Sequence, residues 1–127
     1  MTDTPPPGAP SGSPDPADVE KNKVMAILAY IGILVLVPLL AAKDSPFARY
    51  HANQGLVLLI VAFCGGIVLG ILGFISAFLG PVACVVMIVN LCFFVAVLAF
   101  VIMGIINAAG GKMKPLPVIG TLFTIIK

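Results

Sequence analysis

The chain has 127 residues, of which 61% are apolar and 9% charged, and its formal net charge is +2. A soluble domain is typically about half apolar and a quarter charged. No charged residue falls between positions 52 and 111, and a stretch of that length without a charge cannot form a surface that faces water. These values exclude a soluble enzyme and a secreted mini-protein. The net charge is also too small for a nucleic-acid binder, so we expect an integral membrane protein whose main partner is the lipid bilayer.

The first 23 residues differ from the rest because proline, glycine and serine alternate there with acidic side chains. Such a segment has too few apolar side chains to offset the entropy lost on ordering. It is predicted to be a disordered proline-rich tail.

Three apolar runs follow, at residues 24–42, 55–79 and 82–107. Each is long enough, at 1.5 Å per residue, to cross the hydrocarbon core of a bilayer. Between the first two lies a polar segment, residues 43–54, in which Ser45 followed by Pro46 indicates a helix start. Gly80 and Pro81 separate the last two runs. The predicted fold is an all-α membrane domain over residues 24–111 with three transmembrane helices.

The C-terminal residues 112–127 are too short to cross a bilayer, and their apolar side chains cluster on one helical face. We expect a C-terminal interfacial amphipathic helix, and a re-entrant element or partial fourth span is the alternative. With three spans, five basic residues lie on the side of the C-terminus and two on the opposite side. The positive-inside rule then predicts an N-terminus outside and a C-terminus inside the cell.

Small residues recur at helical spacing in the second run, where Gly66 and Gly70 form a GxxxG motif. Such stripes allow close approach of helix backbones in lipid. Helix packing is therefore predicted for Ala62, Gly66, Gly70, Gly73 and the intramembrane amide Asn90. The partner is either another helix of the same chain, a second copy or another membrane protein. For Asn90, a place on a substrate path is the alternative.

The polar segment carries the candidate interaction surface. Its members are Lys43, Asp44, Arg49, Tyr50, His51, Asn53 and Gln54. A hydrogen-bonded cap beside the lipid headgroups is the simpler interpretation of the same residues. His51 is the single histidine and the three cysteines have no ligand spacing, so no metal or other cofactor is expected.

The sequence KDSPFARYHANQG at residues 43–55 resembles the signature of a group of small bacterial membrane proteins. That group carries a domain of unknown function related to the chloroplast inner-envelope import component, the Tic-twenty-like proteins. The resemblance implies a multi-pass protein of the bacterial cytoplasmic (inner) membrane that belongs to a protein-import or translocation assembly.

Taken together, these features predict a non-enzymatic membrane protein that acts as an interaction or assembly subunit. Two alternatives stay open. A small-solute channel or transporter would use Asn90, and a membrane enzyme would use the region of Asp44, Arg49 and His51.

Overall fold

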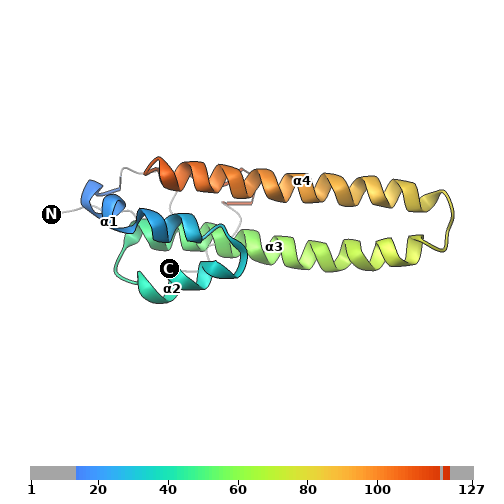
Figure 1. Cartoon of the computed structure of the whole chain (residues 1–127), viewed down its shortest axis with the longest axis horizontal. Helices are drawn as coiled ribbons and strands as arrows, with labels where there is room; N and C mark the ends of the chain where they lie inside the picture. Colours follow the sequence, from blue (N-terminus) through green and yellow to red (C-terminus); the bar gives the residue numbers. More distant parts are fainter. Residues whose placement is uncertain (1–13, 118, 121–127) are drawn as a thin grey trace.

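A computed structural model describes residues 14–117, 119 and 120. Within these residues the chain is helical and has no strand. The elements, in chain order, are α1 (Pro16–Leu28), the 3-10 helix η1 (Gly32–Val35), α2 (Leu36–Ala41), α3 (Pro46–Ser76) and α4 (Val82–Ala109). Figure 1 shows α3 and α4 side by side over the whole length of the molecule, with α1 and α2 packed against one end only.

The long helices form an antiparallel hairpin whose boundaries follow the local sequence. The Ser45 side chain accepts a hydrogen bond from the Ala48 amide and Pro46 occupies the first helical position, as predicted for the start of α3. Gly80 adopts a φ of 60° in the turn, a conformation that glycine takes without a steric penalty. The 31 residues of α3 and the 28 of α4 extend over about 46 and 42 Å at 1.5 Å per residue.

Both long helices are apolar and poorly covered by the rest of the chain. They have mean hydropathies of 2.8 and 3.0 in windows that are 17% and 0% buried. A core helix of a soluble protein would be covered. The residues left exposed include Phe63, Ile71, Phe74, Val85, Met87, Leu91 and Phe94. Two helices of this length and exposure have the properties of membrane-spanning helices facing lipid.

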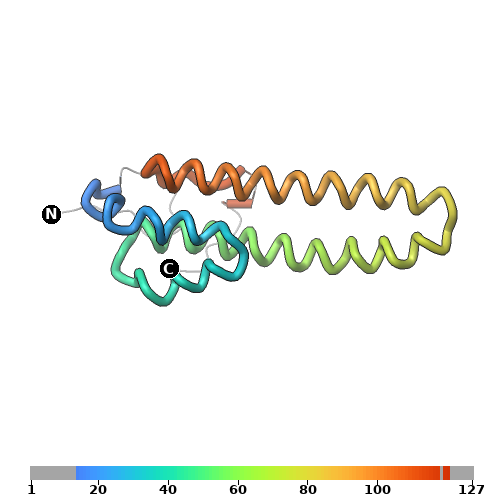
Figure 2. Tube along the Cα trace, viewed as in Figure 1, coloured from blue at the N-terminus to red at the C-terminus, as the bar shows by residue number. Residues whose placement is uncertain are grey.

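The first apolar run is not a third transmembrane helix. α1 ends at Leu28, the chain reverses through Tyr30 and Gly32, and η1 and α2 return toward the starting level (Figure 2). Gly32, the first residue of η1, has a positive φ of 52°, which is outside the right-handed helical region and allows the chain to change direction. Pro38 is the third residue of α2, where its missing N–H costs no helical hydrogen bond. An apolar run has the same composition whether it forms one transmembrane helix or two short helices that reverse direction. Hydropathy alone therefore does not distinguish these two structures for residues 24–42.

The end of the predicted disordered tail is helical. Asp15 accepts a hydrogen bond from the Ala17 amide (3.2 Å) and Pro16 begins α1. The helix therefore includes residues 16–23, which the proline content had assigned to the tail. Residues 1–13 lie outside the described part of the chain.

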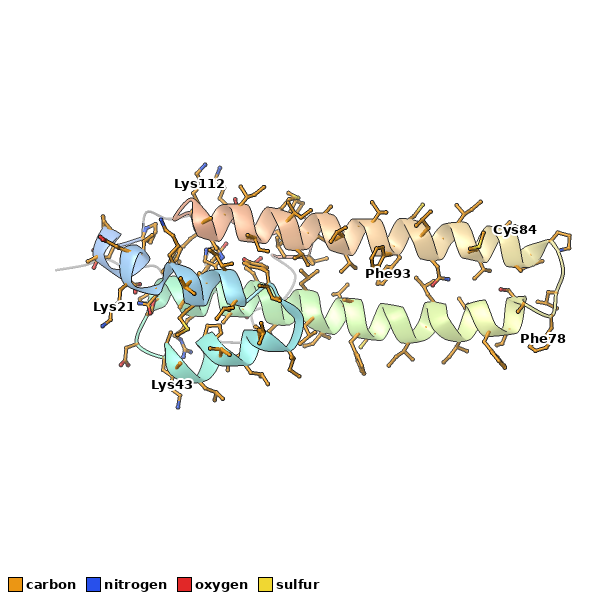
Figure 3. All side chains as sticks on the ribbon, in the orientation of Figure 1. Lys21, Lys43, Phe78, Cys84, Phe93 and Lys112 are labelled. Carbon is orange, nitrogen blue, oxygen red and sulfur yellow. The ribbon has the colours of Figure 1, made fainter. Side chains whose placement is uncertain are left out.

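Residues 112–117, 119 and 120 contain turns but no helix, and they fold back over α3. The predicted amphipathic helix is therefore not formed there, and residues 118 and 121–127 lie outside the described residues. Lys21, Lys43 and Lys112 share one end of the molecule, whereas Phe78 and Cys84 lie at the other (Figure 3). Because two spans replace three, the described N- and C-terminal segments lie at the same end, in contrast to the predicted opposite sides.

Candidate functional site: a buried polar clamp

His51 lies at the centre of the end at which α1 and α2 pack on the hairpin, which we call the capped end. Its ring is fully buried, and the Tyr30 hydroxyl is 2.7 Å from Nδ1. Nε2 lies 2.7 Å from the carbonyl oxygen of Lys112. Three aromatic rings, those of Phe47, Tyr50 and Tyr30, meet the imidazole edge to face at centroid distances of 4.8, 5.4 and 5.6 Å. His51 therefore joins the α1 turn, α3 and the C-terminal segment.

These contacts define the tautomer of His51. A carbonyl oxygen can only accept a hydrogen bond, so Nε2 of His51 is protonated and donates a hydrogen bond to the Lys112 carbonyl oxygen. Nδ1 of the neutral ring then accepts from the Tyr30 hydroxyl. Burial, followed by the neighbouring Tyr50, raises the pKa of Tyr30 well above its ordinary value, which keeps this hydroxyl protonated as a donor.

Gln54, one helical turn after His51, binds the same C-terminal segment with both atoms of its amide. Nε2 donates to the carbonyl oxygen of Gly120, and Oε1 accepts from the Leu116 amide, each at 2.9 Å. The side chain is fully buried. Tyr30, His51 and Gln54 form what we call the polar clamp. It satisfies backbone groups in a segment that has no secondary structure to do so.

Two glycines allow the elements around the clamp to approach each other. A Cβ at Gly104 of α4 would overlap the Tyr30 ring, and one at Gly55 of α3 would overlap the Ala29 carbonyl. Both positions are helical, where glycine costs about 1 kcal/mol relative to alanine. The close contacts explain why glycine occupies them: they place the α1 turn directly between the two long helices.

Asp18 fixes α1 to the start of α3. Its carboxylate accepts from the Ser45 hydroxyl at 2.5 Å and from the Phe47 amide at 3.1 Å. The first amides of a helix have no partner within the helix, and the N-terminus favours negative charge. Asp18 therefore completes the cap of α3 from a neighbouring helix, with Asn22 donating to the same carboxylate at 2.8 Å.

The residues of the predicted interaction surface differ in their exposure to solvent. Lys43 and Asp44 are exposed and Arg49 is partly buried, whereas the remaining members are fully buried: Tyr50, His51, Asn53 and Gln54. The residues His51, Asn53 and Gln54 are consequently interior and hold the capped end together. The predicted enzyme region is also divided, because Asp44 faces solvent and His51 does not.

The predicted packing residues are divided in a similar way. A Cβ added at Gly66 or Gly70 would meet nothing within 4 Å, so neither glycine is required for close packing against α4. Gly70 instead borders a groove between the two long helices. The close approach is at Gly65 instead, where a Cβ would overlap the Phe93 ring that extends from α4 (Figure 3). Ala62 is partly buried.

Asn90 connects the two long helices inside the apolar region. Its Nδ2 donates to the carbonyl oxygen of Leu69 across the hairpin at 3.3 Å and to that of Val86 in its own helix at 3.1 Å. Gly73 lies opposite, with its would-be Cβ 3.8 Å from Nδ2. These two bonds satisfy the Nδ2 donor of an amide that lies among apolar residues.

The sequence-based site missed Tyr30, Asp18 and Gly65. Tyr30 lies within the apolar run at residues 24–42, where a single tyrosine indicates a hydroxyl that needs a partner. Asp18 lies in a segment assigned to disorder. Gly65 and Gly66 are adjacent in the sequence, and the rotation of α3 about its axis decides which of the two faces α4.

The polar side chains of the site form internal hydrogen bonds that connect separate segments of the chain. Both His51 nitrogens are engaged, both Gln54 amide atoms are engaged, and no clamp side chain is more than 2% exposed. In this conformation the clamp offers neither a free nucleophile nor a free ligand atom. Among the described residues, no group of three or more His, Cys, Asp or Glu side chains lies close enough together to hold a metal ion.

Comparison with known proteins identifies the family. Residues 21–123, which include α3, α4 and the whole polar clamp, match the magnetosome magnetite crystal formation protein family, MamF/MmsF. The chain belongs to this family. The earlier resemblance to the Tic-twenty-like import proteins is therefore wrong, and a translocation role has no support from it.

Curated relatives within the family match over a short stretch. The chain is 50% identical to magnetosome protein MamF and 47% identical to MmsF, both of Paramagnetospirillum magneticum, over 38 residues each. It is also 47% identical to MamF of Magnetospirillum gryphiswaldense over 38 residues. Each match covers 30% of this chain and 34%, 36% and 34% of the respective relatives, so it spans about a third of their length. No solved structure gives a significant match.

Proposed function

We propose that this chain is a non-enzymatic component of a magnetosome-type membrane that contributes to magnetite crystal formation by organising the membrane and its proteins. The observation that carries the proposal is the extent of the family match, which includes both long helices and the clamp. The relatives are named magnetosome proteins.

A non-enzymatic role agrees with the use of the polar side chains. Tyr30, His51 and Gln54 make hydrogen bonds inside the protein. Catalysis would require at least one such group to reach a substrate. The clamp instead gives a small membrane protein a rigid end outside its two spans.

The distribution of charge supports a topology for the membrane-inserted protein. The basic residues of the described chain belong to the capped end: Lys21, Lys23, Lys43, Arg49, Lys112 and Lys114. The turn at residues 77–81 carries no charge. By the positive-inside rule the capped end, with both described terminal segments, faces the cytoplasm and the turn faces the opposite side.

Self-association through Gly66 and Gly70 belongs to the same proposal. A side chain added at either glycine would meet only open space, and Gly70 lines a groove between α3 and α4. Surfaces of small residues allow a second helix to approach closely. A Gly70→Cys variant in a background without native cysteines should form a disulfide-linked dimer in native membranes. A Leu72→Cys variant, also on α3, provides the comparison. If both remain monomeric, association through this surface is refuted.

The magnetosome role is tested by expressing the full chain, fused to a fluorescent protein, in a magnetite-forming bacterium that lacks its own members of this family. We expect the fusion to copurify with magnetosome membranes and to change the crystal diameters measured by electron microscopy. A His51→Leu, Gln54→Leu variant, which lacks most of the clamp, should show a reduced effect at equal membrane abundance. Unchanged crystals with the intact protein present in the magnetosome membrane would refute the proposal.

A further inference from the structure

The molecule is much wider at one end than at the other. At the capped end, α1, η1 and α2 surround the start of α3 and the end of α4 (Figure 1). Residues 112–117, 119 and 120 fold back over α3 at the same end. Of the described residues, those at the opposite end form the turn at residues 77–81 and the helix ends that it joins. A transmembrane protein of this shape displaces unequal areas in the two leaflets.

The contacts of the α1 turn define the level of this widening. Tyr30 packs against Gly104 and Ala29 against Gly55. From Gly55 to the end of α3, and from Gly104 back to the start of α4, each helix extends about 32 Å at 1.5 Å per residue. This equals the hydrocarbon thickness of a bilayer, about 30 Å. The hairpin beyond the turn therefore fills the hydrocarbon core, and α1, η1 and α2 lie in the headgroup region of one leaflet.

The outer face of this region is apolar rather than polar. Ile33 is 72% exposed and Leu40 67% exposed, and Leu36 is also exposed. The face lies next to helices that contact lipid, so lipid is the partner that covers it. Apolar helical faces at this level insert about 5–10 Å into the headgroup and acyl boundary, where their binding depends on membrane curvature.

The widening is also fixed in place. Asp18 binds the start of α3 through Ser45 and Phe47. At the other end of α1, Tyr30 binds His51. The apolar face cannot leave the headgroup region without breaking these buried contacts, which makes the capped end a rigid wedge.

We propose that η1 and α2, held by these contacts, form a one-sided interfacial wedge that makes the protein accumulate where the leaflet at its capped end is convex. The partner is the lipid surface itself, and the inference does not depend on a role in magnetite formation.

The test uses the full chain with its three cysteines replaced by alanine and a single new cysteine, Lys43→Cys, at the exposed capped end. The protein is reconstituted into giant vesicles of phosphatidylcholine and phosphatidylglycerol, and a membrane-impermeant fluorescent maleimide labels only molecules whose capped end faces outward. A tether of about 20 nm radius is then pulled, and its outer leaflet is convex. We expect labelled protein to be enriched in the tether about twofold or more, relative to a lipid dye.

Two matched variants make the result specific. Ile33→Ser, Leu36→Ser and Leu40→Ser together remove the apolar face from exposed positions, and this variant should show a ratio close to one. A Leu79→Cys label on the turn instead selects inverted molecules, which should be depleted from the tether. A ratio of one or less for the intact capped end, or equal enrichment of the serine variant, overturns the proposal. Circular dichroism of each variant verifies that its helices are retained.

Discussion

Replacement of Gln54 by glutamate tests the polar clamp without changing its shape. The amide of Gln54 donates to the Gly120 carbonyl and accepts from the Leu116 amide, and it is fully buried. In Gln54→Glu, an ionised carboxylate still accepts from Leu116 but presents an oxygen to the Gly120 carbonyl. One hydrogen bond is lost, and a buried acceptor is left without a donor.

The magnitude follows from the cost of an unsatisfied buried group, about 1–3 kcal/mol. Desolvation of the carboxylate adds to this cost, so we expect a loss of about 2–4 kcal/mol at pH 7. A protonated carboxyl group has the O–H that Gly120 requires. The penalty should therefore be largest at neutral pH and should decrease as the pH falls toward about 4, where an ordinary glutamate protonates.

The assay is cleavage by trypsin after Lys112 in detergent micelles, combined with thermal unfolding followed by circular dichroism. Release of Leu116 and Gly120 from the clamp should accelerate this cleavage at pH 7. Because trypsin is slow in acid, the pH series relies on thermal unfolding. Gln54→Leu cannot form either bond and should be destabilised to the same extent at all pH values, whereas Lys43→Gln at an exposed position should resemble wild type. A Gln54→Glu protein as stable as wild type at pH 7, or a penalty independent of pH, would refute the assigned bonding.

Three further predictions concern other contacts, and the first two are measured by thermal unfolding in micelles. Tyr30→Phe removes the donor to His51 and should cost about 1–3 kcal/mol. Tyr50→Phe should cost little, because the buried Tyr50 hydroxyl has no hydrogen-bond partner among the described residues. Equal losses would contradict this difference. Gly104→Val forces a side chain into the Tyr30 ring and should cost about 1–3 kcal/mol or more, whereas Gly66→Val, facing open space, should be tolerated. Finally, cysteines at Lys43 and Leu79 should react with an impermeant reagent from opposite sides of the membrane, and labelling of both from one side would refute the two-span topology.

Local sequence was sufficient wherever the structure depends on local interactions. Ser45 and Pro46 predicted the start of α3, because a cap and a proline act within one helical turn. Gly80 and Pro81 predicted the turn of the hairpin, and α4 ends at Ala109, close to the predicted residue 107.

The reversal after α1 was not predictable in the same way. Residues 24–42 have the length and hydropathy of a span, and these quantities do not depend on the direction of the chain. The reversal is stabilised by contacts with residues distant in sequence, Gly55 and Gly104. A single glycine in an apolar run is compatible with either outcome.

The sequence by itself determined that this is a membrane protein with a polar segment before a long helical hairpin, because a charge-free stretch of that length can only face lipid. Only the tertiary structure decided that the polar segment is an interior clamp. Its partners, Tyr30 and the Lys112 and Gly120 carbonyls, lie between 21 and 66 residues away along the chain. A polar side chain near the lipid headgroups can be exposed to water, or it can be buried if it forms hydrogen bonds with other parts of the protein. The partners for those hydrogen bonds are distant in sequence, so only the folded structure identifies them.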